Sequence, residues 1–227
     1  MRQNLRSTWT RRGVLGALAL AAGIVALPLL AGPSALAQQA APLPGFDLAR
    51  ATEDKVIGDP KAPITIIEYA SLTCSHCAHM HTDILPRIKA EFIDTGQAKL
   101  IFRDFPMDQV ALTASMFSRC VAPERYFSML SALFKSQKAW FAAKDPLAEV
   151  GKTARMAGLT PEQQEACLSN KQLETHILQT RLDGIKKYNI SGTPTLILND
   201  GAVVIDGARE EELINALVKL GAKRKAE

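Results

Sequence analysis

The sequence lacks the excess of positive charge that is typical of a nucleic-acid-binding protein. Four of its 27 basic residues lie in residues 1–37, which contain no acidic residue, so the rest of the chain balances 23 basic against 23 acidic residues. This balance predicts no basic patch and no nucleic-acid partner. At 227 residues the chain can bury a full hydrophobic core, and one domain with an insertion is favoured over two domains.

Cysteine is scarce, and the spacing of the four cysteines excludes two kinds of site. Only Cys74 and Cys77 form a Cys-x-x-Cys pair. Because Cys120 and Cys167 are isolated in the sequence, a zinc site built from two such pairs is not predicted. Covalent haem attachment requires a histidine directly after the second cysteine, where Ala78 stands. We therefore expect no cofactor and no resident metal.

The longest apolar run lies near the N-terminus. A basic stretch precedes an Ala-, Leu- and Gly-rich segment from Val14 to Leu30, and residues 35–37, Ala-Leu-Ala, are small enough for a cleavage site. This pattern predicts that residues 1–37 are a signal peptide. We therefore expect an exported, periplasmic protein, in a compartment where disulfides persist.

The export route and the fate of the signal stay open. Residues 10–15, Thr-Arg-Arg-Gly-Val-Leu, resemble a twin-arginine export signal, but basic residues also precede the apolar run in ordinary secretion. An uncleaved signal that anchors the protein in the membrane is a third alternative, because the run is long enough to consider. Pro28 and the cleavage site argue against the anchor.

The first part of the mature chain predicts a linker and then an α/β unit. Residues 38–62 are rich in Pro, Ala and Gln and in turn-forming residues, so we expect a linker, with a possible short strand at 55–57. Residues 63–105 have the pattern of a right-handed βαβ unit. Its predicted elements are a strand over 64–70, a helix over 75–93 and a strand over 99–103. Pro86 is expected to kink this helix or to mark its last turns.

The middle of the chain, residues 106–188, is predicted to be an inserted helical domain. Capping residues and prolines indicate new helices after residues 122, 144 and 160, and a last long helix over 171–188. Strand signals return in residues 189–222. They predict a hairpin with strands at 195–198 and 202–205 around an Asn-Asp-Gly turn, followed by an amphipathic helix over 209–220.

The Cys-x-x-Cys pair stands where the predicted strand 64–70 meets the predicted helix 75–93. Unpaired N–H groups and the helix dipole at such an N-terminus favour negative charge. Cys74 is therefore predicted to be the reactive thiolate, and Cys77, one turn further, its shielded partner. A plain structural disulfide is the alternative.

Three polar side chains near this pair have more than one interpretation. Glu68 lies in a strand that is apolar on both phases, which is typical of a strand covered on both faces. A buried carboxyl group there can shuttle protons, although a position on the outer face is the alternative. His79 and His81, with the two cysteines, could form a copper(I) site, but they are more simply surface or packing histidines.

The order of these elements resembles the DsbA family of bacterial thiol oxidases, over about residues 55–220. The resemblance depends on three features together: the Cys-x-x-Cys after the first long strand, Thr193-Pro194 before a later strand, and the helical block between them. It implies an α/β structure, namely a thioredoxin-like fold with an inserted helical domain. Residues 63–105 and 189–222 would form the thioredoxin-like part.

The resemblance also implies roles for individual residues. His76, between the cysteines, would assist the Cys74 thiolate, unless it is only a surface histidine; Ser75 replaces the proline of the best-known family members. Glu68 matches a buried glutamate that assists proton transfer at the second cysteine. Pro194 would form a cis peptide bond, and the backbone of Thr193 would pair with substrate.

Cys120 and Cys167 both fall in the predicted helical insertion. In an oxidising compartment two remaining cysteines usually pair, so we expect a structural disulfide, worth about 4 kcal/mol in the chain-entropy treatment. A regulatory role for this disulfide is the less favoured alternative.

The resemblance implies a periplasmic thiol oxidase that acts on reduced exported proteins and is reoxidised by a DsbB-like membrane partner. A disulfide isomerase or reductase on the same fold is the first alternative, and a copper-binding protein is the second. Isomerases of this superfamily usually carry an N-terminal dimerisation domain, for which residues 38–62 are too few. We therefore expect a monomer.

Overall fold

The computed structural model of the chain describes residues 46–224. The predicted signal peptide, residues 1–37, and the first part of the predicted linker lie outside the described residues. Within residues 46–224, none of the helices has the length and hydropathy of a membrane span.

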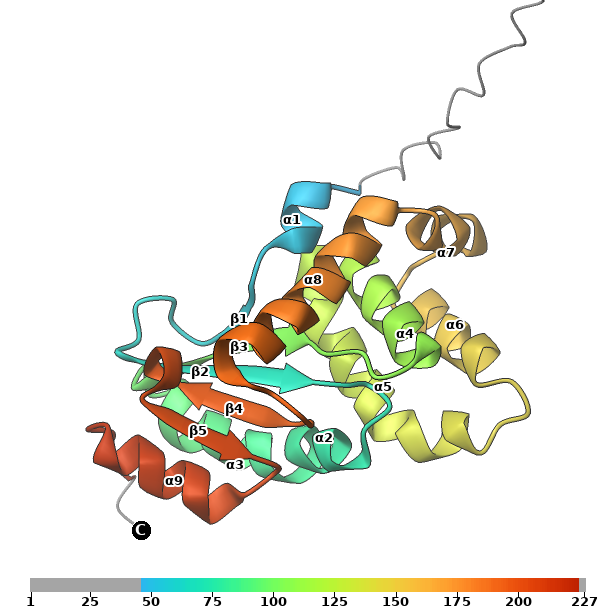
Figure 1. The fold of residues 1–227 in the computed structure, drawn as a ribbon. Helices are drawn as coiled ribbons and strands as arrows, with labels where there is room; N and C mark the ends of the chain where they lie inside the picture. Colours follow the sequence, from blue (N-terminus) through green and yellow to red (C-terminus); the bar gives the residue numbers. More distant parts are fainter. Residues whose placement is uncertain (1–45, 225–227) are drawn as a thin grey trace, which may run out of the picture. The chain divides into compact units, whose positions relative to one another are not determined.

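A five-stranded mixed sheet forms the centre of the fold (Figure 1), with the strand order β1-β3-β2-β4-β5. The strands are β1 (Lys55–Ile57), β2 (Ile64–Ala70), β3 (Ala98–Asp104), β4 (Thr195–Leu198) and β5 (Val203–Asp206). β2 and β3 are parallel, as the βαβ pattern predicts, and the other three pairings are antiparallel. β2 lies in the middle and six of its seven residues are buried, which explains its apolar residues on both phases.

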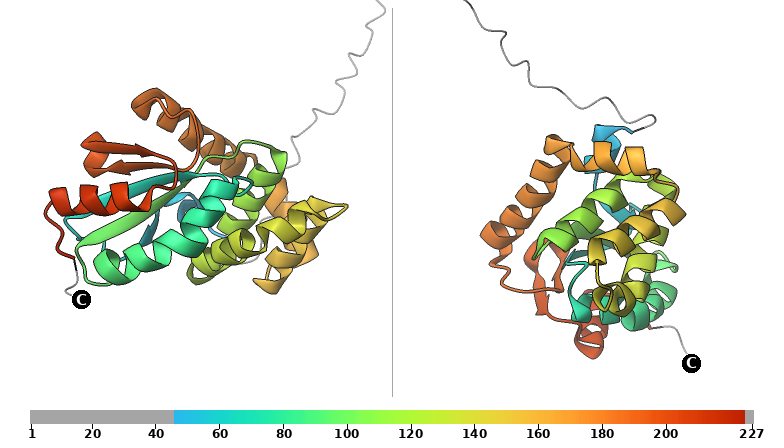
Figure 2. Two further views of the ribbon diagram at one scale, coloured as in Figure 1. Left: turned by 90° about the horizontal axis from the view of Figure 1, so that it is seen from below. Right: turned by 90° about the vertical axis from the view of Figure 1, so that its right-hand side faces the viewer.

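Helices cover both faces of the sheet. One face carries α9 (Glu210–Lys219) and the helical segment after β2, and the other carries the end of α8 (Lys171–Tyr188), as Figure 2 shows. The segment after β2 is helical over the predicted residues but not regular. It consists of α2 (Ser75–His79), a π-helical turn over Met80–Ile84, α3 (Leu85–Ile88) and a second π-helical turn over Lys89–Ile93. Pro86, which has no N–H group, is the second residue of α3, just past the first wide turn.

The residues between β3 and β4 form the expected helical insertion. Its helices are α4 (Gln109–Cys120), α5 (Tyr126–Phe141), α6 (Pro146–Met156), α7 (Pro161–Leu168) and α8. Four of them begin at a residue whose side chain accepts a backbone N–H: Asp108, Asp145, Thr160 and Asn170. These caps explain why the helix starts were readable in the sequence. One apolar cluster runs from the sheet into the insertion, so the two parts share a core.

The prediction of a linker over residues 38–62 is wrong for residues 48–52, whereas the possible short strand at 55–57 is confirmed. Leu48–Thr52 form helix α1, and Lys55–Ile57 form β1, which pairs with β3. Asp47 caps α1, and the guanidinium group of Arg119 donates a hydrogen bond to the Ala51 carbonyl at 2.7 Å. A five-residue helix is too short to be stable alone, so these contacts with distant residues make the structure, and a local sequence pattern cannot reveal them.

Candidate active site

Cys74 occupies the N-cap of α2, directly after the loop that leaves β2. Its backbone is extended, its N–H donates to the Ser71 carbonyl at 3.1 Å, and its own carbonyl accepts from Ala78 N–H at the same distance. The cysteine is therefore fixed at the helix start with its thiol partly exposed. This is the geometry that the strand-to-helix junction predicted.

The surroundings of Cys74 favour the thiolate. The pKa of Cys74 is lowered from 9.0 to about 5, first by a hydrogen bond from the Cys77 thiol and then by Thr193 and the N–H groups of Cys77 and His76, while burial opposes the change. The contribution of His76 is thus its backbone N–H at the first turn of the helix. The His76 side chain is exposed.

Cys77 has the opposite environment. It is fully buried, and burial raises the pKa of its thiol, with further contributions from Cys74 and from the charge of Glu68. In this structure both cysteines are free thiols. The reduced pair is therefore polarised, with a stabilised thiolate on the outer sulfur and a proton held on the inner one.

Thr193 and Pro194 lie beside the outer sulfur. The peptide bond between them is cis, and the Cys74 thiol lies 3.2 Å from the Thr193 carbonyl oxygen. The Thr193 hydroxyl points to the sulfur of Met107 at 3.3 Å, and the Met107 side chain is exposed. Two segments that are far apart in the sequence therefore meet at Cys74, as the resemblance implied.

Glu68 lies in the interior, and its partner was missed in the sequence. No part of its side chain is exposed, and both of its carboxyl oxygens are within 3.1 Å of His81 Nε2. The only available signal was that His81 follows Cys77 by four residues, which places both on the same side of a helix. Of the two simpler positions expected for His81, on the surface or packed in the interior, the structure shows the second, because only 6% of its side chain is exposed.

A second residue that the sequence did not reveal, Gln137 of α5, supports the cysteine loop. Its side-chain amide donates to the Leu72 carbonyl at 2.8 Å and to the Cys74 carbonyl at 3.1 Å. Gln137 is itself buried. A helix of the insertion therefore holds the backbone at Cys74 in place. No pattern in the sequence predicts this contact.

The structure does not bring His79 and His81 together as a copper site would require. His79 bonds to Asp83 at 2.9 Å with 56% of its side chain exposed, whereas His81 faces inward to Glu68. The two histidines therefore point in different directions. Within residues 46–224 no group of three or more His, Cys, Asp and Glu side chains could hold a metal ion.

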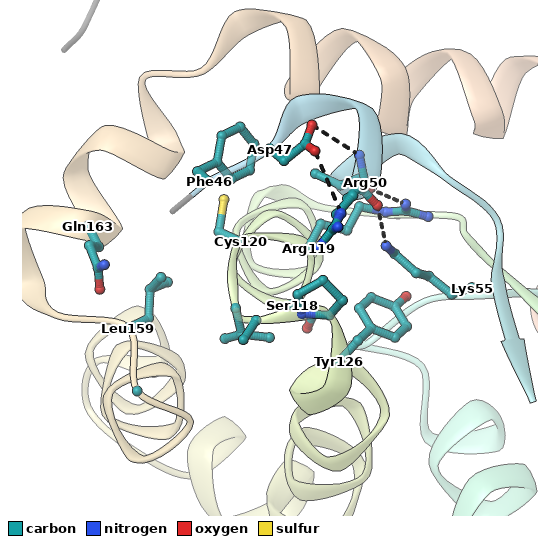
Figure 3. Close-up of a pocket in the computed structure, with 15 residues that line it drawn as sticks. Phe46, Asp47, Arg50, Lys55, Ser118, Arg119, Cys120, Tyr126, Leu159 and Gln163 are labelled. Carbon is teal, nitrogen blue, oxygen red and sulfur yellow. Dashed lines mark hydrogen bonds and ion pairs between the residues drawn. The ribbon is translucent and has the colours of Figure 1, made fainter. Parts of the chain in front are cut away.

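Cys120 and Cys167 are joined by a disulfide, with an S–S distance of 2.05 Å and Cα atoms 6.2 Å apart. It connects the end of α4 to α7 inside the insertion. Cys120 lines a polar pocket of about 260 Å³ between α1 and α4 (Figure 3), where Lys55 and Arg119 lie against the ring of Tyr126. Neither Cys74 nor Cys77 lines this pocket, so it is separate from the thiol site.

Comparisons with known proteins agree with this geometry. Residues 50–219 match the family model described as Thioredoxin. A relative from Rickettsia bellii, named "Putative protein-disulfide oxidoreductase", is 32% identical over 151 residues, which are 64% of this chain and 57% of that protein. Disulfide bond formation protein D of Bacillus subtilis is 27% identical over 158 residues, 65% of this chain and 68% of that one. The chain thus spans little more than half the length of the Rickettsia relative.

Solved structures give the same result. The crystal structure of Wolbachia pipientis alpha-DsbA1 is 35% identical, with a TM-score of 0.67 over 74% of this chain and 90% of that chain. Oxidised BdbD from Bacillus subtilis is 25% identical, with a TM-score of 0.63 over 74% of this chain and 92% of that chain. The similarity therefore includes both the sheet and the helical insertion.

Proposed function

Because the chain belongs to the DsbA-like thiol:disulfide oxidoreductases of the thioredoxin family, we propose that it introduces disulfide bonds into exported proteins through Cys74 and Cys77. One observation carries the proposal. The pKa of Cys74 falls to about 5, while burial raises that of Cys77. One sulfur of the pair is thus a good leaving group in water, and the other is a buried thiol.

The chemistry begins with the oxidised protein, in which Cys74 and Cys77 form a disulfide. A substrate thiolate attacks the sulfur of Cys74, a mixed disulfide forms, and Cys77 leaves and takes up a proton. A second substrate thiolate then attacks the substrate sulfur of that mixed disulfide. The substrate disulfide forms, Cys74 leaves as a thiolate, and the two electrons of the substrate thiols remain on the cysteine pair.

The stabilised Cys74 thiolate supports the oxidase over the isomerase or reductase alternative. Whatever lowers the pKa of the leaving thiol stabilises the reduced protein, which makes the disulfide form a stronger oxidant. The cis Thr193–Pro194 bond does not separate these alternatives, because the resemblance implies the same loop for the isomerases and the oxidases of the superfamily.

The direction of reaction also sets the partners that we propose. The substrates are reduced proteins that have reached the periplasm, and Thr193, whose carbonyl lies 3.2 Å from the Cys74 thiol, pairs its backbone with them. Because each reaction leaves Cys74 and Cys77 reduced, a DsbB-like membrane protein has to reoxidise the pair. The protein acts as a monomer.

The redox potential of the Cys74–Cys77 pair tests this function. Equilibration with glutathione buffers, followed by thiol labelling, is expected to give a potential near the value of about −120 mV of a strong oxidant. A potential close to about −200 mV would instead favour an isomerase or reductase. The rate at which the oxidised protein restores activity to a reduced disulfide enzyme, with Cys74→Ser as the control, gives an independent measurement.

A further inference from the structure

Glu68 and His81 form a buried acid–imidazole pair near Cys77. His81 Nε2 lies 3.1 Å and 3.0 Å from the two carboxyl oxygens of Glu68. Glu68 comes from β2, and His81 lies one helical turn after Cys77. Glu68 has no exposed surface, whereas 6% of the His81 side chain is exposed. The imidazole is therefore the part of the pair that contacts water.

Two aromatic rings fix the imidazole in this orientation. The Phe134 ring of α5 stacks on it at 4.3 Å with an interplanar angle of 21°, and the Phe102 ring of β3 meets it edge-on at 5.5 Å. His81 is thus clamped between the insertion and the sheet. A clamped ring keeps one nitrogen on Glu68 without a loss of side-chain entropy at each turnover.

We propose that His81 is a positioning residue that holds Glu68 and carries protons between Glu68 and solvent during thiol exchange at Cys77. This inference deepens the proposed function and rests on it. Cys77 leaves the disulfide as a thiolate inside the protein, and its buried sulfur has to take up a proton. Glu68 is close enough for its charge to act on that sulfur. Because Glu68 does not touch water, it can be reprotonated only through a neighbour.

The proton balance fits this route. Two substrate thiols lose two electrons and two protons in one turnover. The electrons reduce the Cys74–Cys77 disulfide, one proton ends on Cys77, and the other stays in solvent because Cys74 remains a thiolate. The proton that reaches Cys77 passes from solvent to His81, from His81 to Glu68 and from Glu68 to the sulfur. In the reverse direction Cys77 loses its proton by the same path.

Three other ionisable or charged groups are packed near the pair. Cys77 on α2 keeps its proton, because burial raises its pKa. Tyr126 of α5 is affected by the charge of Glu68, but burial raises its pKa well above the usual value, so it stays neutral. The Arg119–Asp104 ion pair, with a 2.6 Å contact, lies against Tyr126, and the Arg119 guanidinium is 5.9 Å from that ring.

The test compares four variants of the full mature protein: His81→Gln, Glu68→Gln, the double variant, and His79→Gln as the matched control. His79 lies on the same helical segment but contacts only Asp83 at the surface. The measurement is the rate of reaction between the oxidised protein and a reduced peptide thiol, followed by stopped flow from pH 5 to pH 9. We expect His81→Gln to react about tenfold more slowly at pH 7 and with a flatter pH profile. In the Glu68→Gln background the same change is expected to have no further effect.

The possible outcomes separate this inference from the proposed function. An unchanged pH profile in His81→Gln, or a loss that adds fully to that of Glu68→Gln, would overturn the role of His81. If His81→Gln does not fold, His81→Phe keeps the stack on Phe134 and is expected to show the same flattened profile. If the unaltered protein reacts with no thiol through Cys74, the proposed function itself fails.

Discussion

The two cysteine pairs of this protein have the same atoms but opposite surroundings. Cys74 is the partly exposed N-cap of α2, and its thiolate is stabilised first by the Cys77 thiol and then by Thr193 and the backbone N–H groups of the first turn. Cys120 is the last residue of α4, where the helix dipole disfavours an anion, and Cys167 is fully buried. The comparison teaches that the place of a cysteine on its helix separates a reactive pair from a structural one.

The largest effect on the rate of thiol exchange is expected from changes to Cys74 and Cys77, at the start of α2. Replacement of the nucleophile in Cys74→Ser should lower the rate of thiol exchange at least about a thousandfold, because a serine hydroxyl is not activated there. Cys77→Ala keeps the stabilised thiolate, so it should collect mixed disulfides with substrates. Non-reducing gels of each variant from cells measure this difference. If the Cys77→Ala variant carried no mixed disulfides, this would contradict the assignment of Cys74 as the cysteine that bonds to substrate.

The second effect concerns the Cys120–Cys167 disulfide and is expected in the free energy of unfolding. In the double variant Cys120→Ala, Cys167→Ala a loop of 47 residues is no longer closed, which predicts a loss of about 4 kcal/mol in the free energy of unfolding. Urea denaturation measures this loss, and the rate of thiol exchange should stay within about twofold. A clear change in the rate or in the redox potential would mean that the buried disulfide regulates the site.

The third prediction concerns how the stability of the reduced protein depends on pH. The pKa of Cys74 is lowered to about 5 in the fold, so the thiolate stabilises the fold above the unfolded pKa near 9 and this contribution is lost as the pH falls through about 5. After allowance for solvent screening it is worth about 1–3 kcal/mol at pH 8. Thermal unfolding of both redox forms should find the reduced form more stable at pH 8 but not at pH 4. If the reduced form were the more stable one at both pH values, the proposed contribution of the Cys74 thiolate to stability would be contradicted.

The smallest effect tests the support of the cysteine loop by the insertion. Gln137→Leu leaves the Leu72 and Cys74 carbonyls without their donor, which should cost about 1–2 kcal/mol of stability and change the reactivity of Cys74 toward a thiol reagent. Gln164→Leu is the matched control, since buried Gln164 also donates to two backbone carbonyls, those of Gly151 and Leu159. Equal thiol reactivity in both variants would show that Gln137 has only a structural role.

Local patterns in the sequence were sufficient for much of the fold. The strand β2, the hairpin of β4 and β5, and the capped starts of the insertion helices were predicted because each depends on neighbouring residues. The turn at Asn199 and Asp200, both with positive φ, is an example, since those residue types tolerate that conformation. The reactive position of Cys74 could be predicted for the same reason.

The features that the sequence did not reveal depend on partners far along the chain. Helix α1 requires Arg119, and the cysteine loop requires Gln137. The inward orientation of His81 depends on Glu68 and on the stacking of Phe134. A single histidine or glutamine forms no repeating pattern in the sequence. Its distant partner can therefore be identified only when the fold is known.

The position of β2 in the sheet also has a consequence for how the chain reaches this fold. β2 pairs with β3 soon after it is made, but its other edge has to wait for β4, and the contact from Thr65 to Asn199 joins residues 134 positions apart. Until then a strongly apolar strand keeps an open edge, which is slow to close and prone to association. During part of this interval Cys120 is present without its partner Cys167, while Cys74 and Cys77 are already on the chain. Correct pairing of the cysteines therefore depends on the order in which the segments emerge and fold.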